Sequence, residues 1–167
     1  MGNSTDNLQA AFAGESQASR KYLYFAEKAD KEGQPQVARL FRAASEAETV
    51  HARNHLNAMK GIKSVKENLS AAIGGEHEEF TEMYPGFIST AEKEGNAEAK
   101  KTFVWANAVE KIHHELYQEA LKSVEARQEP AEAPYYVCPV CGNTVLGKAP
   151  DRCPICGAPG SKFKKID

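Results

Sequence analysis

The sequence predicts a mainly α-helical protein, a four-helix bundle followed by a small metal-binding module. Apolar residues in residues 5–128 recur three, four and seven positions apart, which is the period of an amphipathic helix. The same stretch contains only two prolines, Pro35 and Pro85. All four cysteines lie between Cys138 and Cys156, so the C-terminal end forms a chemically separate module.

The composition is that of a globular protein. Hydrophobic residues make up 41% and charged residues 26% of the 167 residues, and the formal net charge is −2. A nucleic-acid-binding protein would carry a marked basic excess, and no apolar stretch approaches the roughly 20 residues that span a bilayer. The first residues are polar and lack the apolar core of a secretory signal. We therefore expect a soluble, cytoplasmic protein that binds neither nucleic acid nor a membrane.

Glycines and prolines divide the first segment into four expected helices. The tripeptide Lys-Glu-Gly at 31–33 and again at 93–95 supplies a glycine that can end a helix, and Pro35 suits the first turn of the next one. Gly61 is the expected break between the second and third helices. Pro85 falls inside the third helix, where it should kink the helix or open a π-bulge. These signals place the helices at residues 5–32, 35–60, 66–94 and 97–128.

This helical segment repeats itself as two hairpins. A shift of 61 or 62 residues superposes the apolar positions and several polar ones. The features that the two copies share include a matched glutamate on the first helix and a Glu-x-x-His pair on the second. The matched pairs are Phe41 and Phe103, Glu48 and Glu110, His51 and His113, and, at a shift of 61, Glu15 and Glu76.

The repeated glutamates lie on the apolar faces of their helices. Glu15 follows Phe12 by three residues and Glu48 follows Phe41 by seven, and both spacings return to the same side of a helix. Glu15 lies 18 residues before Gly33 and Glu48 lies 15 after it, so the two carboxylates stand at a similar height in the hairpin. The second hairpin repeats this arrangement, which brings both sets to the same level.

A single glutamate of this kind would ordinarily be a surface residue, but the set requires a different explanation. Several buried carboxylates without partners would each be strongly destabilising, and the apolar faces supply no lysine or arginine at matching levels. One glutamate from each of two helices with Glu-x-x-His from the other two is the di-iron or di-manganese arrangement of helix bundles. The predicted ligands are Glu15, Glu48, His51, Glu76, Glu110 and His113, with Glu79 as a fifth carboxylate one turn after Glu76.

The C-terminal module is too short for a self-sufficient hydrophobic core, so a metal should hold it together. Its cysteines form two Cys-x-x-Cys-Gly knuckles, and four thiolates bind either iron or zinc. Beside a redox-capable di-metal site we favour an electron-transfer iron, with structural zinc as the alternative. The ligands are Cys138, Cys141, Cys153 and Cys156, and the expected segments are a bundle at 1–128, a proline-containing linker at 129–134 and the metal module at 135–167.

The glutamate and histidine set, together with Met83-Tyr84-Pro85 and the paired Cys-Pro-x-Cys-Gly knuckles, resembles the rubrerythrin family over nearly the whole chain. The resemblance implies a ferritin-like di-iron four-helix bundle with a C-terminal rubredoxin-like domain that holds one iron. It also implies a peroxidase that reduces hydrogen peroxide to water and protects the cell against oxidative stress. Electrons would come from NAD(P)H through a separate reductase or a rubredoxin.

The resemblance also assigns roles to individual residues. Glu79 matches the extra glutamate that separates rubrerythrins from ferritins, and its charge favours the oxidised iron pair. On reduction, one iron would exchange Glu79 for His51. Tyr22 and Tyr84 would hydrogen-bond the ligand carboxylates, the alternative being that both are ordinary core tyrosines. Three further histidines are expected on polar faces, namely His55, His77 and His114.

The connection between the two hairpins is short. Lys60 and Glu67 are seven residues apart and reach about 25 Å at most, whereas a ferritin-like crossover must return about 27 Å. We therefore expect a domain-swapped homodimer, in which the second hairpin packs on the first hairpin of another chain. An up-down bundle within one chain is the alternative. Two other functions compete with the peroxidase, a ferroxidase or iron-handling protein and a zinc-bearing interaction module.

Overall fold

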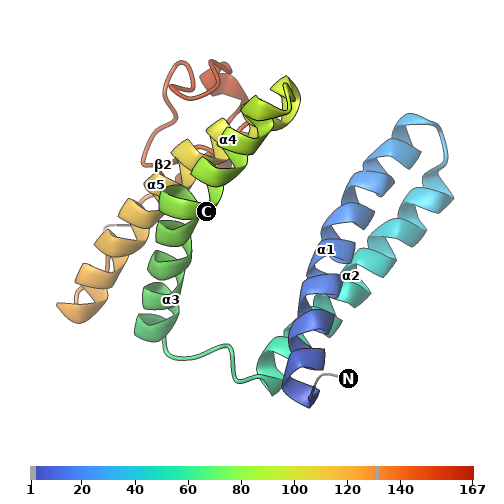
Figure 1. The fold of residues 1–167 in the computed structure, drawn as a ribbon, viewed down its shortest axis with the longest axis horizontal. Coiled ribbons are helices and arrows are strands. Elements are labelled where there is room, and N and C mark those ends of the chain that lie inside the picture. Colours follow the sequence, from blue (N-terminus) through green and yellow to red (C-terminus); the bar gives the residue numbers. More distant parts are fainter. Residues whose placement is uncertain (1–2, 131) are drawn as a thin grey trace. The chain divides into compact units, whose positions relative to one another are not determined.

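Two antiparallel helices, α1 (Ser4–Lys31) and α2 (Pro35–Ala58), form the first hairpin, in which they lie side by side (Figure 1). The structure is a computed structural model, and it describes residues 3–130 and 132–167. The side-chain oxygen of Asn3 accepts hydrogen bonds from the backbone N–H groups of Thr5 at 2.9 Å and Asp6 at 3.1 Å. This cap satisfies amide groups that have no partner within the first turn of α1.

The prediction that a glycine ends the first helix of each hairpin is confirmed. Gly33 has a φ of +71° and Gly95 a φ of +67°, a region that side chains with a Cβ adopt only at a cost. In each turn, the amide N–H that follows the glycine donates to a carbonyl of the preceding helix at 2.9 Å. The two turns therefore reverse the chain in the same way, as expected for a repeat.

Small residues form the contact between α1 and α2. Ala26, Ala29 and Ala38 are buried, and the hydroxyl of Ser45 donates a 2.7 Å hydrogen bond to the carbonyl oxygen of Ser19. Large apolar side chains on the same hairpin are 37% to 68% exposed. They are Leu23, Tyr24, Phe25, Val37, Leu40 and Val50. The hairpin thus buries mainly small side chains and leaves large apolar ones accessible.

The expected third helix is divided into three segments. A π-helix, η1 (Glu79–Met83), joins α3 (Val65–Glu78) to α4 (Tyr84–Lys93), and the N–H of Tyr84 bonds the carbonyl of Glu79, five residues earlier. Proline has no N–H, and its ring collides with the carbonyl four residues back, so the turn before Pro85 widens. The π-bulge expected from Pro85 is therefore confirmed, whereas one uninterrupted α-helix over 66–94 is not what forms.

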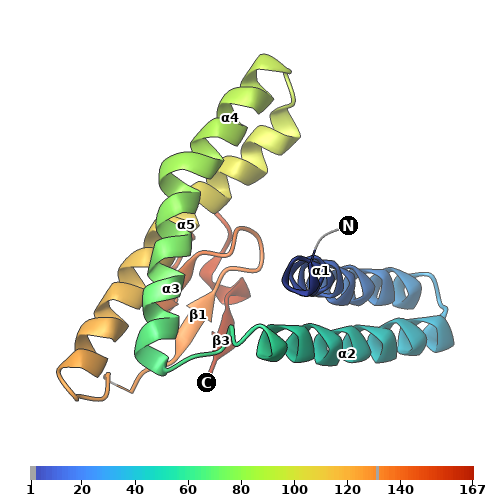
Figure 2. The ribbon, with the colours of Figure 1, turned by 60° about the horizontal axis from the view of Figure 1, so that its bottom comes forward.

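The last long helix, α5 (Ala97–Glu125), packs along both α3 and α4, as Figure 2 shows. It ends three residues before the expected position, because Arg127 adopts a left-handed conformation with a φ of +55°. Within residues 3–130 and 132–167, no helix combines the length and the apolar character needed to cross a membrane.

Three short strands build the C-terminal module. In their antiparallel sheet, β1 (Tyr135–Val137) lies between β2 (Thr144–Leu146) and β3 (Lys164–Ile166), and a 3₁₀ turn, η2 (Gly160–Lys162), precedes the last strand. The hydrophobic core of the C-terminal module centres on Cys138, Cys153 and Phe163. The chain divides into two units at residues 63 and 64, and the module belongs to the same unit as α3, α4 and α5. The mainly helical class with a small four-cysteine domain is confirmed.

Candidate metal centres

The first hairpin brings three predicted ligands together. Ligand atoms of Glu15 on α1 and of Glu48 and His51 on α2 all lie within 4.8 Å of one another. The Nδ1 atom of His51 lies 2.8 Å from Oε2 of Glu48. The Glu-x-x-His spacing explains this contact, because residues three apart on a helix share one face.

The second hairpin repeats this group. Ligand atoms of Glu76 on α3 and of Glu110 and His113 on α5 again lie within 4.8 Å of one another. Nδ1 of His113 lies 2.8 Å from Oε2 of Glu110 and 3.7 Å from Oε1 of Glu76. Exposed fractions of these three side chains range from 16% to 28%. Each hairpin therefore presents two carboxylates and one imidazole nitrogen as a preformed half of a metal centre.

The electrostatics of the second group indicate a site for cations. Burial, followed by the charge of Glu110, raises the pKa of Glu76 to about 7. The hydrogen bond to Glu110 raises the pKa of His113 as well. Glu76 thus takes up a proton more readily than usual because it is partly dehydrated among negative charges, and His113 does so because Glu110 stabilises its charged form against the opposing effect of burial. Bound metal ions would supply the missing positive charge, and mixed carboxylate and imidazole donors suit iron or manganese.

Glu79 lies beside this group without belonging to it. It is the first residue of the π-helix η1, and it lies outside the trio of ligand atoms within 4.8 Å of one another. Burial, followed by the charge of Glu110 and then of Glu78, raises the pKa of its carboxyl. The structure thus places the fifth carboxylate within electrostatic range of the second half-site, on a locally widened helical turn.

Each of the two predicted tyrosines packs with two phenylalanines of its own hairpin. Ring centroids in both aromatic trios are 5.5 to 6.3 Å apart. Within the described residues of its hairpin, neither tyrosine hydroxyl makes a hydrogen bond, so its expected bond to a ligand carboxylate stays a prediction. The trios are Tyr22, Phe25 and Phe41, and, 62 residues further on, Tyr84, Phe87 and Phe103.

Sequence reasoning missed two residues at the second half-site. Burial, followed by the charges of Glu76 and Glu110, raises the pKa of Tyr117, which lies four residues after His113 on the same face of α5. That spacing could have identified it. Thr144 of β2 places Oγ1 2.9 Å from Nε2 of His113. No pattern in the sequence predicts the contact between Thr144 and His113.

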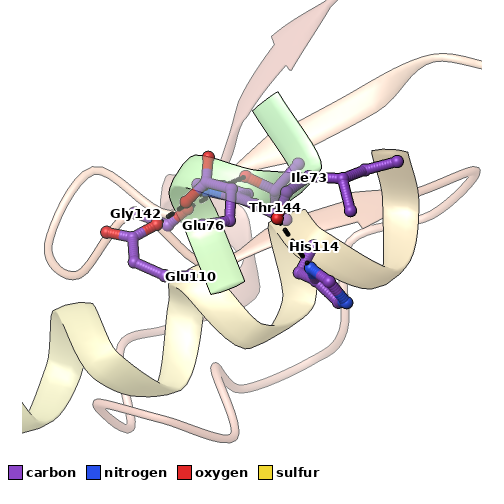
Figure 3. A network of polar contacts seen from close by, with 7 residues as sticks. Ile73, Glu76, Glu110, His114, Gly142 and Thr144 are labelled. Carbon is purple, nitrogen blue, oxygen red and sulfur yellow. Dashed lines mark hydrogen bonds and ion pairs between the residues drawn. The ribbon is translucent and has the colours of Figure 1, made fainter. Parts of the chain in front are cut away.

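Of the three histidines expected on polar faces, His55 is half-buried, and the expectation for His114 needs a correction. His77 is exposed, but His114 is half-buried, and its Nδ1 atom lies 3.1 Å from the carbonyl oxygen of Ile73 (Figure 3). Its ring also packs against Phe80, with centroids 5.4 Å apart. His114 is therefore a structural residue between α3 and α5, not a solvated one.

The four cysteines surround one point in the C-terminal module. The Sγ atoms of Cys138 and Cys156 are 3.6 Å apart and those of Cys141 and Cys153 are 3.5 Å apart. Four sulfurs held tetrahedrally about 2.3 Å from a metal would be about 3.8 Å apart, whereas a disulfide requires about 2.05 Å. Burial works to raise the pKa of Cys153, but backbone N–H donors from Cys156 and Ile155 lower it to about 7. The cluster is therefore suited to iron or zinc.

Comparison with known proteins agrees with both centres. The profile of the family described as Rubrerythrin matches residues 6–121, and that of the rubrerythrin rubredoxin-like domain matches residues 136–164. Rubrerythrin-2 of Clostridium acetobutylicum is 37% identical, with 95% of this chain and 94% of that protein aligned. Rubrerythrin of Porphyromonas gingivalis is 38% identical, with 96% of this chain and 88% of that protein aligned.

Solved structures of nigerythrin give the same result. Its mixed-valence form and its fully reduced, all-ferrous form each superpose on this chain with a TM-score of 0.58 at 34% sequence identity. Each superposition covers 99% of this chain and 88% of nigerythrin. The similarity thus extends over the helices and the four-cysteine module together.

Proposed function

This chain belongs to the rubrerythrin family, an iron-binding group of oxidoreductases, and from that premise we propose that it is a non-haem di-iron peroxidase that reduces hydrogen peroxide to water. The observation that carries the proposal is the paired Glu, Glu and His groups, one in each hairpin. In the cell the activity would protect against oxidative stress. Reduced thiols at the four-cysteine site suit the cytoplasm, where disulfides are rare.

We assign the two repeated groups as the ligands of two iron ions. When bound, two ferrous ions supply the two electrons that, with two protons, convert one hydrogen peroxide molecule to two water molecules. The chain holds these ions with Glu15, Glu48 and His51 from one hairpin and Glu76, Glu110 and His113 from the other. We further propose Glu79 and His51 as alternative ligands of one ion, which agrees with the position of Glu79 beside the second group but outside it.

Tyrosines near the carboxylates can supply hydrogen bonds. Burial raises the pKa of Tyr84 and of Tyr117, and neighbouring carboxylates add to the effect. Both hydroxyl groups therefore keep their protons at neutral pH and can donate to carboxylate oxygens. We propose this role for Tyr84 and, through the repeat, for Tyr22, whose ring occupies the equivalent aromatic trio.

The four-cysteine module would deliver the electrons. Iron on four thiolates is a one-electron carrier, and this site lies in the same unit as the second half of the di-iron centre. We propose that NAD(P)H reduces it through a separate reductase or a rubredoxin. Zinc could not carry electrons at this site. The two metals are easily distinguished, because ferric iron on four thiolates is red and zinc is colourless.

The peroxidase proposal predicts a strong preference for peroxide over dioxygen. We expect hydrogen peroxide to oxidise the ferrous pair at least about tenfold faster than dioxygen at equal concentration, a barrier difference of about 1.4 kcal/mol or more. Stopped-flow absorbance of the anaerobically reduced, iron-loaded protein measures both rates. Oxidation by dioxygen at an equal or higher rate would instead indicate a ferroxidase.

The assembly we propose is a domain-swapped homodimer. The connection at residues 59–64 between Ala58 and Val65 spans about 25 Å at most, and the first hairpin leaves large apolar side chains accessible. A second copy offers a matching hairpin, and exchange removes the need for the connection to return along the bundle.

Light scattering after size-exclusion chromatography should therefore give twice the chain mass of 18.3 kDa. Inserting about 12 glycine and serine residues into the connection should allow both hairpins of one chain to pair, and the mass should fall to that of a monomer. A monomeric wild-type protein would reject the exchange. A variant that stays dimeric despite the long insertion would also count against it.

A further inference from the structure

The C-terminal module rests on the part of α5 that carries His113. A Cβ atom added to Gly142 would lie only 3.8 Å from Cγ1 of Val109, and Val109 is 2% exposed. Two residues further on, Thr144 reaches Nε2 of His113 with its hydroxyl oxygen at 2.9 Å. Gly142 directly follows Cys141, a ligand of the four-cysteine site. The knuckle of one metal site is thus in contact with a ligand of the other.

The directions of these hydrogen bonds determine how the His113 ring is oriented and which of its nitrogens keeps a proton. The Thr144 hydroxyl donates to the carbonyl oxygen of Gly142 at 3.0 Å, so its oxygen accepts a hydrogen bond from the Nε2–H group of His113. In this structure Nδ1 lies 2.8 Å from Glu110, whose ionised carboxylate only accepts, so Nδ1 donates there while Nε2 donates to Thr144. A metal ion bound at Nδ1 would replace that proton, and the neutral ring would keep its remaining proton on Nε2. Figure 3 draws Glu76, Glu110, Gly142 and Thr144 in one polar network.

The equivalent histidine of the other hairpin lacks this partner. Nδ1 of His51 has the same 2.8 Å contact with Glu48, but within the described residues of its hairpin Nε2 has no hydrogen-bond partner. Its side chain is 54% exposed, against 28% for His113. Thr144 is therefore an addition to the second half-site that the internal repeat does not require. It distinguishes two otherwise matching ligands.

We propose that Thr144 is a positioning residue for electron transfer, which holds the His113 ring and completes a route from Cys141 through Gly142 to the di-iron centre. This inference rests on the proposed function. The route consists of covalent bonds and two hydrogen bonds, through which electron tunnelling decays less steeply than through empty space. It lies wholly within residues 64–167, so it is the same whichever chain supplies the first hairpin.

The number of electrons that each peroxide consumes determines how many electrons must pass along the route. Each hydrogen peroxide takes up two electrons and two protons to form two water molecules, which leaves two ferric ions in the bundle. Their return to the ferrous state requires two electrons, each released when a ferrous ion on the four thiolates becomes ferric. In the test described next, dithionite is the initial reductant.

Thr144→Val tests the route, because valine keeps the shape of threonine and removes the hydroxyl, whereas Thr144→Ser keeps the hydroxyl. Each iron-loaded protein is reduced with dithionite and mixed with one equivalent of hydrogen peroxide per iron pair. The rate at which the ferrous pair oxidises is measured in the same trace for all three proteins, and colour development is compared relative to it. The red ferric colour of the four-thiolate site should then develop at least about tenfold more slowly in Thr144→Val than in wild type and Thr144→Ser.

Two further readouts separate positioning from damage to the module. The reduction potential of the four-thiolate iron should be the same in all three proteins, since Thr144 does not contact a sulfur. In the zinc-loaded full chain, ¹⁵N NMR should show a slowly exchanging Nε2–H on His113 in wild type and Thr144→Ser, but not in Thr144→Val. An unchanged rate of colour development in Thr144→Val would overturn the inference, as would the absence of that Nε2–H in the wild type.

If the protein is not a peroxidase, the experiment gives a different result. A wild-type ferrous pair that does not react with peroxide would refute the peroxidase and leave the route open to measurement. In that case one electron equivalent is added to the oxidised protein, and its passage from the four-thiolate iron to the bundle is followed by the loss and return of the red colour. Equal rates in wild type and Thr144→Val would again overturn the route.

Discussion

Replacing Glu110 with glutamine is expected to empty the di-iron site and to lower the rate of peroxide reduction by at least about 100-fold. Glu110 contacts Nδ1 of His113 at 2.8 Å and is the main neighbouring charge acting on Glu76 and Glu79. A neutral amide of nearly the same shape cannot balance the charge of an iron ion. Iron analysis should therefore fall to the content of the four-thiolate site, while the red colour of that site remains.

A matched control comes from the same helix. Glu119 is 72% exposed, and among residues 3–130 and 132–167 its carboxylate pairs only with Lys122, so Glu119→Gln should keep both the iron and the activity. The metal-free form of Glu110→Gln should in addition melt at a higher temperature than the metal-free wild type, because one of several crowded negative charges is gone. A Glu110→Gln protein that keeps its iron pair would remove Glu110 from the ligand set.

The helical hairpins could be predicted because their signals are local. The repeat aligned Phe41 with Phe103, and the structure shows both in aromatic trios with similar distances between ring centroids. Pro85 acts on the turn just before it, so the π-helix at Glu79–Met83 followed from one residue. The end of α5 at Glu125 was missed, because no glycine or proline marks it and the chain turns at Arg127.

The half-sites were predictable for a similar reason. The spacing of Glu110 and His113 fixes their contact through helix geometry alone. Contacts between distant elements are different, because they depend on how the module and the helices pack. The partner of His113 lies 31 residues away at Thr144, and that of His114 lies 41 residues away at Ile73. Neither pair leaves a periodic trace in the sequence.

A protein that has lost the four-thiolate iron should still complete one peroxide turnover but should not sustain continuous catalysis. Each strand of the C-terminal module has three residues, and the buried residues of the module's core are Cys138, Cys153 and Phe163. In small metal domains the metal contributes about 10–16 kcal/mol of folding free energy. Cys138→Ser should therefore unfold the module and abolish the red colour, while circular dichroism shows that the long helices persist.

The same variant shows where electrons enter. If they pass only through the four thiolates, Cys138→Ser reduced by dithionite still consumes one equivalent of peroxide per iron pair at the wild-type rate. Turnover driven by NAD(P)H and a reductase should fall by at least about 100-fold, since nothing restores the ferrous pair. Val140→Ala alters the same knuckle at a side chain that is 48% exposed, and it should leave both rates unchanged. Sustained NAD(P)H turnover in Cys138→Ser would mean that electrons reach the helices directly, and the route through Thr144 would then have no part in catalysis.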